Sequence, residues 1–118
     1  MLDLSHKKLE VYQNSLELIK EIYLITQMFP EKETYGLISQ LRRSAVSIIA
    51  NISEGLSRTT KPDKKRFIEI ARSSLVEVDT HLEIAIRLEY CSEENIENLD
   101  KYLNKIFAVL STLIVKLK

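Results

Sequence analysis

The spacing of apolar residues in residues 35–55 constrains the fold more than any other feature of the sequence. These residues recur at intervals of four, four, three and four, which places them on one face of an α-helix: Leu37, Leu41, Ala45, Ile48 and Ile52. Small residues on the same segment would let a second helix approach closely: Ser44, Ala45, Ser47 and Ala50. Gly55 follows the last apolar residue, and we expect it to end the helix in a left-handed cap.

Three further segments have a helical period. Residues 7–29 follow a polar leader and carry two adjacent apolar stripes, one of Leu9, Tyr12, Leu16, Ile19 and Tyr23, the other of Val11, Leu18, Ile22, Ile25 and Phe29. Pro30 should end this helix, because proline has no backbone donor and disfavours helical backbone at the residue before it. A third helix is predicted to begin at Thr60 or Lys61, beside Pro62 and Asp63, and to run to about residue 90.

The faces of the last two helices follow from the same reasoning. For the third, the residues predicted to face the core are Phe67, Ile70, Ala71, Ser74, Leu75, Val78, His81 or Leu82, Ala85 and Leu88. Ser92 should cap the fourth, whose apolar seam is the most regular of the chain: Ile96, Leu99, Leu103, Ile106, Leu110, Leu113 and Leu117. Four helices joined by short connections predict an all-α protein, an antiparallel up-down-up-down four-helix bundle with a single domain over residues 1–118.

Composition limits the classes of function. The 17 basic and 17 acidic residues cancel, so no overall charge draws the chain to nucleic acid or to an anionic membrane. No apolar run approaches the roughly 18 residues that span a bilayer, and the first residues lack a basic leader, so we expect a cytoplasmic protein. Cys91 is the only cysteine, which excludes an internal disulfide, and we interpret it as a residue at a helix end.

Catalytic and metal-binding patterns are not found in the sequence. The carboxylate-bridged dimetal site of some four-helix bundles needs two Glu-x-x-His pairs, whereas this chain has only His6 and His81, and Glu77 precedes His81 by four residues. We expect His81 to be a partly buried or helix-surface residue that pairs with Glu77. The two glycines flank a helix, and provide neither a nucleophile elbow nor a phosphate-binding loop. We therefore predict a protein that is not an enzyme and has no catalytic residues, metal, cofactor or small-molecule substrate.

Charge is unevenly distributed along the chain. Residues 42–72 contain eight basic residues against three acidic ones, whereas residues 77–100 contain eight acidic residues against Arg87 alone. One interpretation is a patch that binds the RNA or DNA backbone at the connection between the second and third helices, formed by Arg58, Lys61, Lys64, Lys65 and Arg66. The alternative is that basic surface of one subunit complements acidic surface of another.

Three motifs carry a family resemblance that covers nearly the whole chain. They are residues 36–48 (GLISQLRRSAVSI), residues 51–55 (NISEG) and residues 67–77 (FIEIARSSLVE). With these motifs the chain resembles the family of four-helix proteins encoded in intervening sequences of bacterial 23S ribosomal RNA genes. That family is similar in fold to the accessory variability determinant of diversity-generating retroelements. Both resemblances imply a bacterial homopentamer, a ring of five bundles, and the term "ribosomal" in such names reflects the position of the gene.

Matching the family pattern residue by residue selects five polar residues on largely apolar helices: Arg42, Arg43, Asn51, Glu54 and Glu77. The spacing of Arg43, Asn51 and Glu54 places them near one helix face, where they could form a polar cluster with Glu77 of the third helix. We interpret this cluster as a structural network or a subunit interface, with a ligand site as the alternative.

Excess apolar surface predicts self-association. The first helix has two stripes, and the second carries Ile38, Val46 and Ile49 outside its main face. A single bundle core cannot cover all of this surface, and exposed patches of this kind mark interfaces. We predict a closed homo-oligomer of cyclic symmetry with head-to-tail contacts, and five subunits as the resemblance implies.

Overall fold

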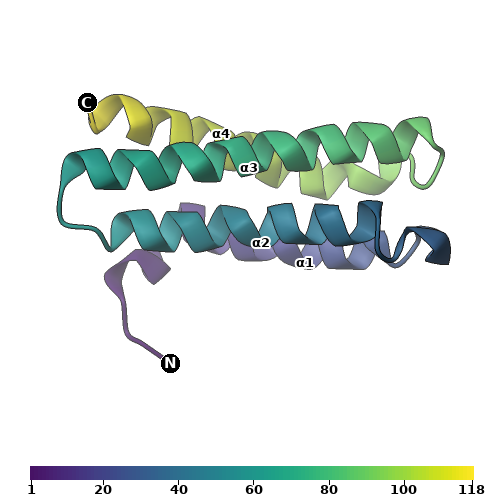
Figure 1. The fold of residues 1–118 in the computed structure, drawn as a ribbon, viewed down its shortest axis with the longest axis horizontal. Helices are drawn as coiled ribbons and strands as arrows, with labels where there is room; N and C mark the ends of the chain where they lie inside the picture. The colour runs from purple at the N-terminus through teal and green to yellow at the C-terminus, as the bar shows by residue number, and fades with distance from the viewer.

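Four long α-helices follow one another in the computed structural model, which describes all of residues 1–118. Their bounds are α1 Glu10–Thr26, α2 Leu37–Leu56, α3 Lys61–Arg87 and α4 Glu97–Lys116. Three short 3-10 helices accompany them: η1 Ser5–Lys8, η2 Glu31–Glu33 and η3 Glu94–Ile96. Successive helices run in opposite directions along the 43 Å axis of the molecule (Figure 1). The predicted all-α antiparallel four-helix bundle is therefore confirmed.

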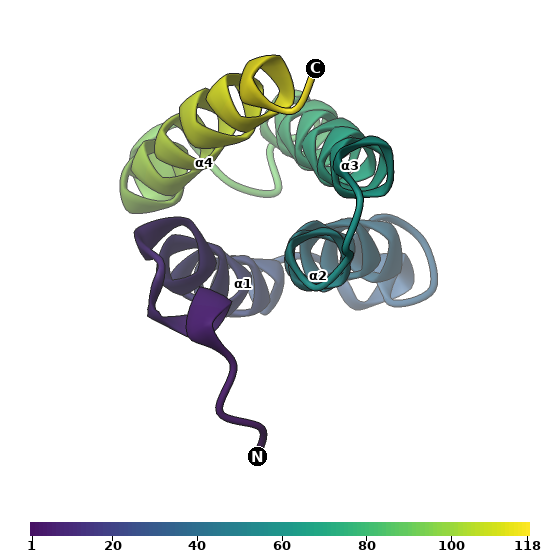
Figure 2. The same cartoon turned by 90° about the vertical axis from the view of Figure 1, so that its left-hand side faces the viewer.

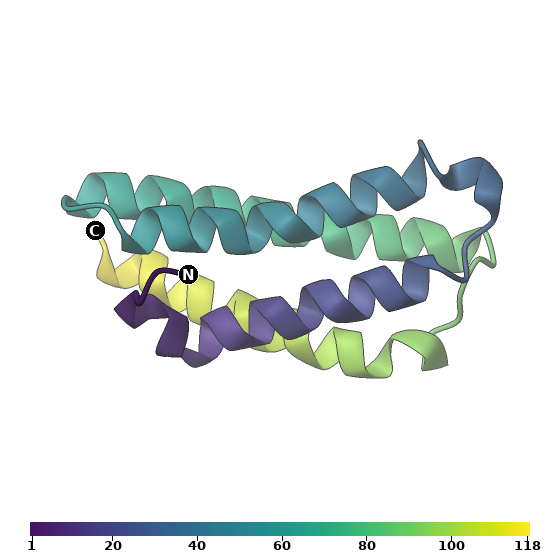
Figure 3. The ribbon, with the colours of Figure 1, turned by 90° about the horizontal axis from the view of Figure 1, so that it is seen from below.

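The helices lie at the corners of a square, so that each helix packs against two neighbours. Viewed end-on, α1 and α2 form one layer and α3 and α4 the other (Figure 2), and α1 also packs against α4 to close the square. The pair formed by α2 and α3 has the most extensive contact. Seen from below, the α1–α2 and α3–α4 connections lie at the same end of the bundle (Figure 3). The α2–α3 connection and both chain termini lie at the other end.

The core contains 22 buried apolar residues drawn from all four helices and the turns beside them. The face predicted for α2 is largely correct, because Leu41, Ala45, Ile48 and Ile52 are fully buried and Leu37 is partly buried. Only the second of the two stripes predicted for α1 enters the core: Val11, Leu18, Ile22, Ile25 and Phe29. In the other stripe Leu9, Leu16 and Tyr23 are exposed, whereas Ile19 is partly buried against the edge of the core. Of the extra apolar residues on α2, Ile38 is buried, whereas Val46 is exposed.

The seam of α4 is confirmed over its first four turns and drifts at its end. Leu99, Leu103, Ile106 and Leu110 are buried as predicted. The next buried residue is Ile114, whereas Leu113 and Leu117 are only partly buried. A helix of 3.6 residues per turn rotates away from a strict seven-residue repeat, which explains this shift by one position.

The face predicted for α3 is wrong at both ends. Ile68 is fully buried, Phe67 is only partly buried, and Ile70 and Leu88 are exposed. One turn before Ala71, the buried face of a helix can pass through Phe67 or through Ile68. In the structure Ile68 is the buried one. The predicted core positions between these two ends are buried: Ala71, Ser74, Leu75, Val78 and Ala85. Of the two alternatives at the next position, Leu82 lies in the core and His81 does not.

Gly55 does not form the expected left-handed cap. It lies within α2, which continues to Leu56, and no glycine of the chain has a positive φ. Its role is steric, because a Cβ at this position would lie 3.0 Å from the Cβ of Phe67 and 3.2 Å from the backbone oxygen of Lys64. The absence of a side chain therefore allows the last turn of α2 to approach the first two turns of α3 closely.

Of the four long helices, only α3 begins with a side-chain cap. The Thr60 hydroxyl accepts a hydrogen bond from the backbone N–H of Asp63 at 3.3 Å and begins α3, as predicted. The Ser92 hydroxyl accepts one from the Asn95 N–H at 3.3 Å, but this bond lies at η3. The prediction that Ser92 caps the fourth helix is therefore wrong, because α4 begins at Glu97 without a side-chain cap. The first helix ends at Thr26 and does not extend to Pro30 as predicted. At the start of the chain, the leader is not simply polar, because His6 is buried with its ring edge-on to Tyr12.

None of the four helices combines the length and the apolar character that crossing a bilayer requires.

Candidate interaction surfaces

The five polar residues predicted to form a cluster do not hydrogen bond to one another within the chain. Arg42 lies against α1, Glu77 and Asn51 lie at the junction of α2 and α3, Glu54 lies near the end of α2, and Arg43 is exposed on α2. The prediction that these five residues form a single connected network inside the subunit is therefore wrong. The side chains form separate local contacts because Arg42 is on the side of α2 that faces α1, whereas the junction with α3 lies on another side of the helix.

Arg42 fastens α2 to the end of α1. Its Nε donates to the Thr26 hydroxyl at 2.9 Å, and the guanidinium lies 4.5 Å from the centre of the Tyr23 ring. The Thr26 hydroxyl in turn donates to the backbone oxygen of Ile22 at 2.7 Å. A cation near the last turn of a helix also interacts favourably with the helix dipole. Arg42 is therefore largely committed to holding two helices of the same chain together.

Small polar residues join α2 to α3. The Ser44 hydroxyl donates to Glu77 Oε2 at 3.0 Å, and the hydroxyls of Ser47 and Ser74 lie 2.9 Å apart. The Asn51 amide donates to the backbone oxygen of Ser47 at 2.8 Å, which ties it to the same junction. The small residues noted in the sequence therefore permit close packing, as expected, and serine hydroxyls supply hydrogen bonds across the contact. Ala50, in contrast, is exposed.

The predicted basic patch gathers at the α2–α3 connection. The guanidinium groups of Arg58 and Arg66 lie 4.7 Å and 4.6 Å from the centre of the Phe67 ring. Lys61, Lys64 and Lys65 occupy the first turns of α3 beside them. Arg58 also forms the one ion pair of the chain, with Glu54 at 2.8 Å, so part of its charge is neutralised.

Histidine and cysteine side chains do not form a reactive centre. His81 does not pair with Glu77, which accepts from Ser44 instead, and its Nδ1 is buried without a hydrogen-bond partner. Cys91 is buried, and desolvation raises the pKa of its thiol, which disfavours the nucleophilic thiolate. No three His, Cys, Asp or Glu side chains lie close enough together to share a metal ion.

A hollow on the outer side of α2 combines apolar and basic side chains. We call it the basic hollow; its volume is about 610 Å³, and it is lined by Tyr23, Thr34, Tyr35, Ile38, Ser39, Arg42, Arg43, Val46 and Ser47. Tyr35, at the edge of the hollow, is 95% exposed. Arg43 makes no ion pair or hydrogen bond within the chain, so its charge is available to a partner.

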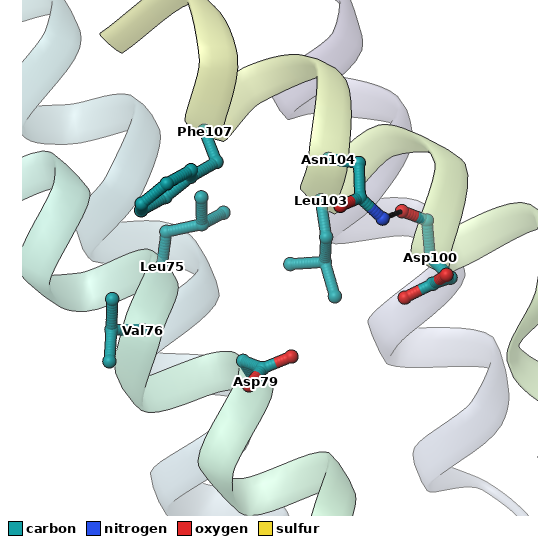
Figure 4. Close-up of a pocket in the computed structure, with 7 residues that line it drawn as sticks. All are labelled: Leu75, Val76, Asp79, Asp100, Leu103, Asn104 and Phe107. Atoms are coloured by element: carbon teal, nitrogen blue, oxygen red, sulfur yellow. Dashed lines mark hydrogen bonds between the residues drawn. The ribbon is translucent and has the colours of Figure 1, made fainter. Parts of the chain in front are cut away.

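A groove between α3 and α4 has the opposite charge. We call it the acidic groove; its volume is about 280 Å³, and it is lined by Leu75, Val76, Asp79, Asp100, Leu103, Asn104 and Phe107. Leu75 comes from α3 and Leu103 and Phe107 from α4, and the carboxylates of Asp79 and Asp100 lie on the two different helices, away from Phe107 (Figure 4). Neither carboxylate forms an ion pair or accepts a hydrogen bond within the chain.

The sequence pattern did not predict that the residues of the basic hollow, or those of the acidic groove, lie together. Asp79 and Asp100 lie in the acidic run of the sequence, but 21 positions separate them, and only the antiparallel pairing of α3 with α4 brings them together. The sequence does hold one indication of the acidic groove. Val76 and Phe107 are apolar residues that lie off the buried face of an amphipathic helix, a position that indicates a contact surface.

The fold and these surfaces define an all-α four-helix bundle protein with unpaired apolar and charged surface and without a metal cluster. The chain belongs to the family described as "23S rRNA-intervening sequence protein", which matches residues 7–112. The resemblance seen in the three sequence motifs is therefore confirmed.

A solved structure supports the same assignment. The chain is similar to the crystal structure of a protein with unknown function from the S23 ribosomal protein family of Bacteroides thetaiotaomicron VPI-5482. The two share 28% sequence identity with a TM-score of 0.80, and the match covers 88% of this chain and 97% of the other. No curated protein matches the sequence of this chain.

Proposed function

We propose that this protein acts without catalysis, as a homo-oligomeric scaffold or interaction module in the bacterial cytoplasm. The observation that carries the proposal is the apolar surface left outside a complete core. The core is closed on all four helices, yet Leu16, Tyr23 and Phe107 remain 42%, 40% and 44% exposed. Burying such side chains against a second subunit would stabilise an assembly by about 25 cal/mol for each Å² of apolar surface.

The charges support the same proposal. The chain has 17 basic and 17 acidic residues but a single internal ion pair, so most of its charged groups have no oppositely charged partner within the chain. A neutral chain with separate basic and acidic surfaces can complement a second copy of itself without net repulsion. We propose a closed ring of cyclic symmetry, with five subunits on the basis of the family resemblance.

Light scattering tests self-association directly. Purified protein at micromolar concentration should give a mass several times the 13.7 kDa of one chain. The mass should hold on dilution through the low micromolar range. A mass near 13.7 kDa throughout would remove the scaffold proposal and leave the bundle fold untouched.

A second candidate function is RNA or DNA binding by the basic patch. The observation that favours it is that Arg58 and Arg66 both pack on the ring of Phe67, with three lysines at the start of α3. Such cations could contact phosphate groups, and the first turn of α3 adds the positive end of a helix dipole.

Salt dependence distinguishes this second function from the first. Binding of a structured RNA to a patch of five cations should weaken steeply as salt rises, because each phosphate contact releases counterions. Replacing Lys61, Lys64 and Lys65 by glutamine should reduce the salt slope, whereas the same change at Lys101, Lys105 and Lys116 of α4 serves as the control. Absence of binding at low salt would eliminate nucleic acid as the partner.

A further inference from the structure

We propose that the basic hollow of one subunit docks into the acidic groove of a second copy of this chain, with Tyr35 and Arg43 as the anchoring residues. This inference rests on the proposed self-assembly and assigns the two surfaces that would form its interface.

The basic hollow has the composition of a contact surface with strong anchors. Tyrosine and arginine are the residues that most often dominate binding energy at protein interfaces. Tyr35 precedes α2 and is 95% exposed, although an aromatic ring of this size is normally at least partly covered in an isolated subunit. Arg43 lines the same hollow and has no partner, whereas its neighbour Arg42 is held by Thr26 and Tyr23.

The acidic groove offers the complementary features. Its walls expose Val76 and Phe107, which could receive an aromatic ring, and Leu75 and Leu103 supply an apolar floor. Asp79 and Asp100, one from each helix, have carboxylates without partners (Figure 4). An arginine placed between two carboxylates would form charge-assisted hydrogen bonds, which are about twice as strong as neutral ones.

The positions of the two surfaces determine the symmetry of the contact. The basic hollow belongs to the layer of α1 and α2, and the acidic groove belongs to the layer of α3 and α4 (Figure 2). Joining unlike surfaces gives a head-to-tail contact, in which each subunit uses one surface for each neighbour. Such contacts close into a ring when the rotation between subunits is a whole fraction of a turn.

Charge reversal tests the pairing. Arg43→Glu places a third acid against Asp79 and Asp100, and Asp79→Lys places a lysine against Arg43. Because like charges across an interface are strongly unfavourable, each single variant should weaken association about 100-fold in sedimentation equilibrium. The double variant Arg43→Glu/Asp79→Lys restores opposite charges at every head-to-tail contact, and should recover association to within about tenfold of the wild type.

Matched controls separate this pairing from general charge effects. Lys105→Glu and Glu69→Lys make the same charge changes at exposed positions outside both surfaces, and should leave association unchanged. Circular dichroism of all variants should show the helical content of the wild type, which confirms that lost association does not reflect unfolding.

Three outcomes would overturn the pairing while self-assembly stands. Association that survives both single variants would place the interface elsewhere. Association lost only in Arg43→Glu would indicate that the hollow pairs with another surface, and failure of the double variant would exclude direct contact between the two charges. A monomeric wild-type protein would instead remove the proposed function itself.

Discussion

Truncating Leu110 tests how the bundle is held together. Its side chain is fully buried in the core, on the seam of α4. Leu110→Ala removes apolar contacts and leaves a cavity, which costs about 2–5 kcal/mol of unfolding free energy. The unfolding entropy of a chain of 118 residues is about 0.25 kcal/mol per kelvin. The expected fall in Tm is therefore about 8–20 °C.

Thermal unfolding followed by circular dichroism measures this change. The matched control is Val115→Ala on the same helix, where the side chain is 64% exposed and its removal should change the free energy of unfolding by less than about 0.5 kcal/mol. All proteins should be compared at equal concentration, because assembly itself stabilises the folded state. A loss below about 0.5 kcal/mol for Leu110→Ala would refute the assignment of this seam to the core.

Three further changes test local features of the fold. Gly55→Ala should lower Tm although alanine favours a helix by about 1 kcal/mol, because the added Cβ would lie 3.0 Å and 3.2 Å from atoms of α3; a higher Tm would refute the steric role. Thr60→Ala should cost about 1 kcal/mol in urea unfolding through loss of the α3 cap, whereas Thr59→Ala, which removes no such bond, should cost little. The Tyr90 hydroxyl donates to Glu33 Oε2 at 2.7 Å, which lowers the pKa of Glu33 and raises the pKa of Tyr90. Their stabilisation should be lost as pH falls through the lowered Glu33 pKa, below the ordinary value of 4.5, and as pH rises through the raised Tyr90 pKa, above 10.0; equal pH dependence of Tyr90→Phe and wild type would contradict this.

Much of the fold could be predicted because the local signals agree with one another. The Thr60 cap begins α3 as predicted, and the apolar period within each segment gives most of its buried face. Two other boundary signals misled, because α1 ends at Thr26 ahead of Pro30, and the Ser92 bond belongs to η3 and does not cap α4. The errors occur where a local signal has two interpretations. Gly55 at the end of a helical pattern fits a left-handed cap or a close contact between helices, and only the packing of α2 on α3 decides.

The candidate surfaces were less predictable than the fold, because they depend on which helices become neighbours. Arg42 and Arg43 are adjacent in sequence, but the first is held by α1 and the second is free. The presence of Asp79 and Asp100 in one groove likewise requires the register of α3 against α4. A sequence pattern can locate polar residues on one side of a helix, but it does not specify the side chains that they meet.

Subunit counting by native mass spectrometry tests the central claim of a closed assembly most directly. A ring of five chains of 13.7 kDa predicts one dominant species of about 69 kDa, without a ladder of larger masses. The same species should persist as protein concentration is raised, because a closed ring has no free surface of the kind that forms it. A spectrum containing only the 13.7 kDa chain, or a continuous series of multiples of that mass, would contradict the account.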